Sequence, residues 1–273
     1  MTFNPDYVPS GANNRANEYF RKINNVKIAK NEMSRSEFVG GATSFPLTVT
    51  VGGGIASAVN QAVFNFNVAA GDAAPGKRLV ISLVTNGYAA PGSVTLTVDG
   101  VPATLVGEIS TPPGVPSQWA GTFIVLNENA GNRAGVATFP EPVNGIGGCS
   151  HSVVGMGPAT DEIPLDVVTS ASKDGSPQWV EDIARLAGGI TISTVSGVDT
   201  GGVSYTGGLV SSRSNGYNLP FFIHVGRSED VVDDPTSEVT IRYAVDAGDI
   251  NGLVLASWGP GSPVMQQLPV LPE

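Results

Sequence analysis

From residue 43 onward the chain consists of short stretches of alternating apolar and polar residues, each ended by glycine, proline, asparagine or aspartate. Alternation with a period of two is typical of half-buried β-strands. Glycine contributes 35 and proline 20 of the 273 residues, while charged residues make up only 14%, so turns should be frequent and long charged helices rare. We expect strands near residues 46–51, 62–68, 77–85, 93–98, 103–108, 118–126, 135–138, 150–156, 189–195, 219–225, 238–245 and 252–258.

The clearest local signal is a hairpin over residues 93–106. Its two apolar-polar alternating runs are separated by the dipeptide Asp99-Gly100. A tight type I′ turn needs positive φ angles at both of its central residues, and Asp-Gly is one of the few pairs that adopt them readily. The sequence therefore predicts two antiparallel strands joined at Asp99 and Gly100.

About a dozen strands without helices at βαβ spacing predict an all-β fold, an antiparallel β-sandwich of the jelly-roll or lectin-like kind. We place this domain at residues 43–260 and expect residues 261–273, which are rich in proline, to form an extended tail. Residues 176–189 allow two interpretations. Ser176-Pro177 and Gly188-Gly189 have the residue types that start and stop a helix, but a strand that buries Val180 and Ile183 fits as well.

Residues 1–42 differ from the rest and are interpreted as an extended, partly helical N-terminal arm. They hold six of the fourteen basic residues and four of the twenty-four acidic ones, so the arm carries +2 and the remainder −12. The arm has few aliphatic residues with which to build a core. Its amphipathic stretch is 15–29, where Tyr19, Ile23 and Val26 share one helical face. A short docking helix and a loosely attached leader both agree with this composition.

Charge and residue counts exclude several function classes. A net charge of −10 disfavours a nucleic acid as partner. The longest apolar runs, such as 79–84, are too short to span a bilayer, and the first residues lack the features of a secretory signal. With one cysteine and two histidines, neither an intramolecular disulfide nor the usual transition-metal cluster is available. We therefore expect no cofactor and no metal.

Candidate catalytic groups are few. Cys149 and His151 lie in one short run, and in a strand they would face the same side with Ser150 facing the opposite one. A small buried thiol beside a histidine is the simpler interpretation than a nucleophile with its base. Glycoside hydrolysis needs two placed carboxyl groups, for which the pairs Glu162 with Asp166 and Glu181 with Asp182 are available. Neither pair has the same-face spacing of a site carried on a strand, so we expect no enzyme.

Two other groups of residues could bind ligands. The acidic segments 229–234 and 246–251 contain enough oxygen atoms for a calcium ion, but neither matches the spaced calcium loop, and solvated turns are expected instead. Trp119, Trp179 and Trp258 could form a platform for sugar rings if they were exposed. Trp119 and Trp258 belong to apolar strands, so packing inside the fold is the expected role for both.

Four segments carry a resemblance to a known group of proteins: Leu79-Val-Ile-Ser-Leu-Val-Thr-Asn-Gly87, Val94-Thr-Leu-Thr-Val-Asp-Gly-Val-Pro-Ala-Thr-Leu-Val106, Ala187-Gly-Gly-Ile-Thr-Ile192 and Leu253-Val-Leu-Ala-Ser-Trp258. In their order the chain resembles β-sandwich structural proteins of tailed-phage virions, which include capsid decoration proteins, head fibres and tail adhesins. The resemblance covers roughly residues 45–260 as a texture of strands and turns. It implies a non-enzymatic virion protein that is assembled in the cytoplasm of the bacterial host.

The resemblance also implies a role for the arm, because such proteins commonly anchor a globular domain through an N-terminal segment. The expected partners are other virion proteins, capsid or tail subunits, and further copies of this chain in a homo-oligomer. Binding to a host-surface glycan as a tail-associated adhesin is the alternative, and a glycosidase is a third possibility. The predicted partner-binding residues are the aromatic, aliphatic and basic side chains of the arm: Phe3, Tyr7, Arg15, Tyr19, Phe20, Arg21, Lys22, Ile23, Lys27 and Phe38.

Overall fold

The structure is a computed structural model, and it divides the chain into two units, Met1–Ala42 and Thr43–Glu273. The described residues all belong to the second unit, which we call the body. They are 46–111, 118–157, 162–171, 178–197, 203–216, 222–230, 234–243 and 250–261. The predicted helix over 15–29 and the ten predicted partner-binding residues lie outside this set.

The described residues contain strands and no α-helix, which confirms the predicted all-β class. Their strand pairs are antiparallel and form four sheets. The first nine strands build two of them, in the orders β1-β9-β3-β7-β6 and β2-β8-β4-β5. Their bounds are β1 Thr48–Ser57, β2 Gln61–Ala69, β3 Arg78–Asn86, β4 Thr95–Val98, β5 Val101–Pro102, β6 Thr104–Ser110, β7 Gln118–Leu126, β8 Asn132–Val143 and β9 Ile146–Val154.

The remaining strands build the other two sheets, in the orders β10-β17-β12-β15-β14 and β11-β16-β13. Their bounds are β10 Asp166–Ala171, β11 Gln178–Arg185, β12 Ile190–Gly197, β13 Val203–Tyr205, β14 Val210–Gly216, β15 Phe222–Glu229, β16 Asp234–Tyr243 and β17 Ile250–Trp258. Within the described ranges, no strand of the first nine pairs with a strand of the last eight. The two halves of the body therefore have separate sheets and meet through side chains and loops.

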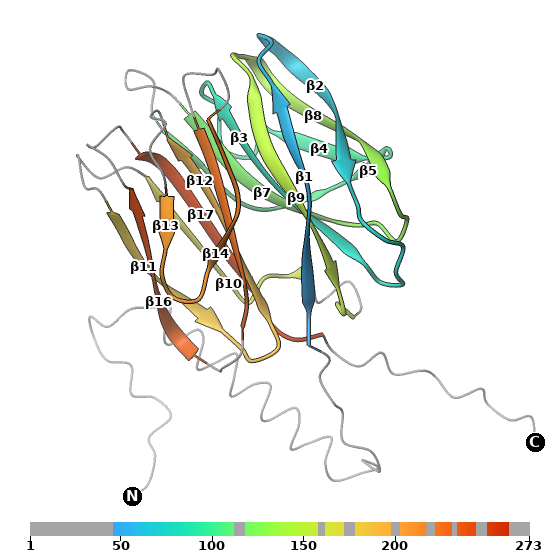
Figure 1. Cartoon of the computed structure of the whole chain (residues 1–273). Coiled ribbons are helices and arrows are strands. Elements are labelled where there is room, and N and C mark those ends of the chain that lie inside the picture. Colours follow the sequence, from blue (N-terminus) through green and yellow to red (C-terminus); the bar gives the residue numbers. More distant parts are fainter. Residues whose placement is uncertain are drawn as a thin grey trace, which may run out of the picture. The chain divides into compact units, whose positions relative to one another are not determined.

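Three apolar clusters show that the four sheets are stacked as layers (Figure 1). The first cluster, which includes Phe64 of β2 and Phe123 of β7, lies between the β2 sheet and the β1 sheet. The second joins Val80 of the β1 sheet to Ile192 and Trp258 of the β10 sheet. The third lies between the β10 sheet and the β11 sheet. The two five-stranded sheets are consequently covered on both faces. The arrangement is sandwich-like, but it has four layers where a single sandwich has two.

Both ends of the described chain lie at one end of the body, which we call the proximal end. The amide of Leu47 donates to the carbonyl of Gly188, 2.7 Å away. A side chain on Gly188 would begin 3.4 Å from Pro46 Cα and 3.3 Å from Pro260 Cβ. The first and last described residues therefore lie beside one another. The strand order places the turns between β1 and β2 and between β8 and β9 at the opposite, distal end.

Each of the twelve predicted strands overlaps a strand of the structure, and the predicted turn at Asp99-Gly100 is confirmed. The hairpin is shorter than the predicted 93–106, because β6 leaves β4 and pairs with β7 in another sheet. Asp99 and Gly100 have φ angles of 51° and 79°, and Val98 pairs with Val101 across the turn. The helix weighed for 176–189 is wrong, because β11 crosses that segment and pairs with β16. Of the strand alternative, Ile183 is buried as expected, but Val180 is 47% exposed. Burial of Ile183 against a neighbouring sheet outweighed a helical period that only a few residues carried.

Candidate functional site

The proximal end is held together by Arg78, the first residue of β3. Its guanidinium donates through Nε to Glu162 Oε1 at 2.6 Å and also reaches the carbonyls of Gly76 at 2.6 Å and Gly157 at 3.2 Å. The backbone carbonyl of Glu162 in turn accepts from the indole of Trp258, 3.1 Å away. Arg78 thus fastens the connection between the two halves of the body to β3, at the end where the described chain begins and ends.

Lys77 closes the first half at the same end. The side chain is 1% exposed, and its ammonium donates to the carbonyls of Ala70 at 2.8 Å, Asp72 at 2.6 Å and Asn129 at 2.6 Å. An ammonium has three donors, so all of them are used. These carbonyls belong to the turns that follow β2 and β7, strands of two different sheets. Lys77 therefore links two layers from the inside.

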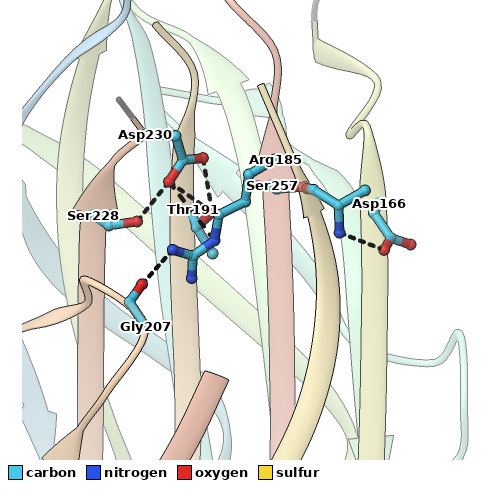
Figure 2. A network of polar contacts seen from close by, with 8 residues as sticks. Asp166, Arg185, Thr191, Gly207, Ser228, Asp230 and Ser257 are labelled. Atoms are coloured by element: carbon cyan, nitrogen blue, oxygen red, sulfur yellow. Dashed lines mark hydrogen bonds and ion pairs between the residues drawn. The ribbon is translucent and has the colours of Figure 1, made fainter. Parts of the chain in front are cut away.

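Arg185 and Asp230 close the second half (Figure 2). Arg185 ends β11, and its Nε lies 3.8 Å from Asp230 Oδ1, while another guanidinium nitrogen donates to the carbonyl of Gly207. Ser228 donates to Asp230 at 2.8 Å and Thr191 donates at 3.0 Å. Burial raises the pKa of Asp230, and the hydrogen bond from Ser228 and the charge of Arg185 oppose that rise. Figure 2 shows these groups converging from separate strands.

Because the basic side chains of these networks are buried, the exposed charge of the described part of the body is negative. Lys77, Arg78 and Arg185 are buried, and among the basic side chains whose exposure is described none is exposed. Six acidic residues are exposed in the same set: Asp72, Asp99, Glu128, Glu141, Asp182 and Glu229. The described surface can therefore attract a positively charged partner and has little with which to bind a phosphate backbone.

The run from Cys149 to His151 lies on β9 as the alternation predicts. Cys149 belongs to the second apolar cluster, whereas Ser150 bonds to the carbonyl of Ala69 on the opposite side of the sheet, 2.9 Å away. His151 is fully buried, and within the described residues neither ring nitrogen has a hydrogen bond of normal geometry. Burial lowers the pKa of His151 to about 3, the charge of Arg227 adds to this, and the backbone at Val80 opposes it weakly.

The candidate carboxylates have structural partners. Glu162 pairs with Arg78, and Asp166 accepts the amide of Ala184 at 3.1 Å. Asp182 is exposed and Glu181 partly so. One expectation was wrong: the acidic segment 229–234 is not simply a solvated turn, because Asp230 is buried in the network described above. The hydroxyls of Ser228 and Thr191 and the charge of Arg185 replace water there.

The tryptophans with described side chains are in the interior, as expected. Trp119 is fully buried, packs against Phe123 and Phe139, and donates to Glu108 at 2.8 Å. Trp258 is 1% exposed and belongs to the second apolar cluster. Neither can serve as a sugar platform. The side chain of Trp179 and the acidic segment 246–249 lie outside the described residues.

One apolar hollow of about 270 Å³ lies near the proximal end. Leu105, Val106, Ile163 and Pro164 line it, together with Thr104 and Glu162. Ile163 is 70% exposed, more than any other large apolar side chain described. Across the described ranges no three histidine, cysteine or acidic side chains are grouped as metal ligands would be, and no helix there is long and apolar enough to cross a membrane.

Sequence reasoning missed the three buried cations. The adjacent pair Lys77 and Arg78 opens a strongly apolar run, and this position was a usable signal, since alternation sends one side chain to each face of the sheet. The pairing of Arg185 with Asp230 left no such signal, because the two residues lie far apart in the sequence. Comparison with known proteins adds no function: no family model, curated protein or solved structure matches the chain.

Proposed function

We propose that this protein is a non-enzymatic structural protein of a bacteriophage virion, most simply a capsid decoration, cement or head-fibre protein that docks through its arm. The fold we propose for the body is of the jelly-roll kind. In an eight-stranded jelly roll numbered along the chain, strands 1, 8, 3 and 6 form one sheet and 2, 7, 4 and 5 the other. With β6 set aside as an added edge strand, the order β1-β9-β3-β7 opposite β2-β8-β4-β5 follows this scheme. Viral capsid and lectin domains use such folds.

The observation that carries the proposal is the division of the chain into two units, Met1–Ala42 and Thr43–Glu273. Pro46, the first described residue of the body, lies beside Gly188 at the proximal end. The preceding segment of the sequence holds the basic side chains that the described surface lacks. A segment that forms a unit of its own is available to a neighbouring subunit. Its charge of +2 suits an acidic docking surface.

Surface charge and internal clamps support the same interpretation of the body. Many copies of a shell protein make the same contacts with their neighbours, so the protein needs a rigid shape and a surface that does not aggregate. Lys77, Arg78 and Arg185 fix the turns at the proximal end, and the exposed acidic residues give the described surface one sign of charge. Self-association and the head location belong to the proposal as well.

The first experiment locates the protein in particles from the producing culture by immunogold electron microscopy, with antibody raised against residues 43–273. Label over the heads supports decoration, and particles without label overturn the assignment to the virion. The second experiment adds purified full-length protein or the variant lacking residues 1–42 to particles that lack the protein. Attachment of the full-length chain alone supports docking through the arm. Equal attachment of both would show that the body docks by itself.

A tail-associated adhesin that binds host glycans is the second candidate, and one observation favours it. Tyr88, in the connection that follows β3, is 40% exposed at the distal end, opposite the start of the described chain. An aromatic ring in that position could stack on a sugar. Label confined to the tail tip, together with glycan binding that Tyr88→Ala abolishes, would favour this candidate over decoration. Binding to no member of a glycan panel would remove it.

A further inference from the structure

The two halves of the body have the same strand order. In the first half one sheet runs β1-β9-β3-β7-β6, and in the second half the corresponding sheet runs β10-β17-β12-β15-β14. In these sheets β1, β9, β3, β7 and β6 occupy the same places as β10, β17, β12, β15 and β14. Counted along the chain, these are the first, last, third, third-last and fourth-last strands of each half. The smaller sheets agree too, since β2-β8-β4 corresponds to β11-β16-β13. Among the described residues only β5 has no counterpart.

Backbone hydrogen bonds support the correspondence at the start of β3 and β12. Each strand follows a tight turn that contains a glycine with positive φ, Gly76 at 65° and Gly188 at 81°. The turn closes through Lys77 N to Ala74 O in one half and through Gly189 N to Leu186 O in the other. A second backbone hydrogen bond at the start of each strand is also repeated. Asn127 N donates to Lys77 O at 3.0 Å, and Asp230 N donates to Gly189 O at 2.8 Å.

The halves also face each other in a reciprocal way. β3 lies opposite its own counterpart β12, where Thr194 bonds to Ser82 at 2.6 Å and meets Thr122 of β7 at 2.9 Å. β7 lies opposite β17, the counterpart of β9, and β9 lies opposite β15, the counterpart of β7. These pairs are exchanged as they would be across the two-fold axis of a dimer of identical subunits, whereas the contacts of β6 with β10 and β17 have no counterpart of similar extent among the described residues.

We infer that the body is a tandem duplication of one module, and that the face β1-β9-β3-β7-β6 is an interaction surface whose partner is a second module of the same topology. In this chain the partner is covalently attached. The surface between the modules, which we call the seam, is therefore a dimer interface built into one polypeptide. This inference does not depend on the proposed function.

The seam contains apolar and polar groups together, as subunit interfaces do. The interior of the first module holds four aromatic side chains in one apolar cluster, those of Phe64, Trp119, Phe123 and Phe139. The seam combines the second apolar cluster with a chain of hydroxyls from Ser82, Thr194 and Thr122, the buried His151 and the charge of Arg227 near it. Subunit interfaces commonly keep such polar groups beside an apolar centre.

A cut in the connection between the modules tests the inference on the full chain. A recognition site for a specific protease is inserted between Gly157 and Glu162, the protein is purified intact, and it is then cleaved. We expect the two pieces to stay together in size-exclusion chromatography, with an unchanged far-UV circular dichroism spectrum. Loss of the β signal on cleavage would overturn the inference, because a single folded unit cannot be divided there.

Two substitutions at neighbouring positions of β7 sharpen the test. Thr122 faces the seam and Phe123 faces the interior of the first module. After cleavage, T122K should separate into two pieces that each melt cooperatively, since the new charge becomes solvated once the modules part. F123K should unfold the first piece. If the pieces of T122K unfold as those of F123K do, or stay joined until they unfold, the seam is not a dimer-type interface.

Discussion

At the scale of single residues, the buried charges of Lys77 and Asp230 each contact several polar groups. The ammonium of Lys77 has three carbonyl acceptors, and the carboxylate of Asp230 has two hydroxyl donors and a guanidinium. Burying a charge is costly, and each partner offsets part of that cost, so removal of one member is strongly destabilising because it leaves the others without hydrogen bonds. These residues therefore hold turns of the body together.

The first prediction concerns Lys77. Lys77→Met keeps the apolar stem and removes the ammonium, which leaves three carbonyls without their donor. We expect the free energy of unfolding to fall by about 3 kcal/mol, measured by urea denaturation followed by circular dichroism. Arg133→Met is the matched control, because Arg133 makes a single, partly exposed ion pair with Asp99 at 3.5 Å. That change should cost less than about 1 kcal/mol. Equal losses in the two variants would contradict the role given to Lys77.

The second prediction concerns the response to acid. The folded-state pKa of His151 is about 3 and the unfolded value is 6.5. Between these values the unfolded chain holds a proton that the folded chain does not, so stability is complete above pH 6.5 and falls as the pH is lowered toward 3. The slope from this residue approaches about 1.4 kcal/mol per pH unit.

His151→Leu should remove that slope. Urea midpoints of both proteins, measured from about pH 7.5 to about pH 4, should diverge as the pH falls, with the variant the less sensitive of the two. Asp230 acts in the opposite sense, because its raised pKa adds stability as the pH falls through it, and it does so in both proteins. If the two curves stayed parallel, the folded protein would not be holding His151 in its neutral form at these pH values.

At the scale of elements, residue pattern and turn chemistry were sufficient for most strands. The segment 118–126 is rich in aromatic and β-branched residues, and its predicted bounds coincide with those of β7. The strands that the sequence did not predict include β10, β13 and β14, which are only three to seven residues long. β10 and β13 pair with strands far away in the chain, and β14 is a short strand rich in serine at the edge of its sheet, so local pattern alone could not place them.

The third prediction tests the turn at Asp99 and Gly100. A side chain added to Gly100 would meet open space, so the only cost of Gly100→Ala is the left-handed backbone at φ 79°. We expect a loss of about 1–2 kcal/mol in the free energy of unfolding. Gly100→Asn should lose less, because asparagine tolerates this conformation better. A costless alanine substitution would mean that the turn can adopt another geometry in solution.

At the scale of the whole molecule, the layering had a signal that the sequence analysis did not use. The run from Leu79 to Val84 is apolar on both faces of the strand, interrupted only by Ser82, and both faces of β3 are buried. Such a continuous run indicates a strand covered on two sides, in contrast to the half-buried strands of a single sandwich. The position of the second layer pair could not be predicted, because it depends on which faces meet across the seam.

The last prediction concerns the division between arm and body. The chain divides between residues 42 and 43 into two units, so removal of residues 1–42 should leave the urea midpoint of the body unchanged. Leu47 itself is 2% exposed, packs in the seam and donates its amide to Gly188. Leu47→Ala in the full chain should therefore cost about 2–4 kcal/mol. A truncated chain that is destabilised as much as Leu47→Ala would mean that the arm completes the body, and an arm in that role could not at the same time reach a neighbouring subunit.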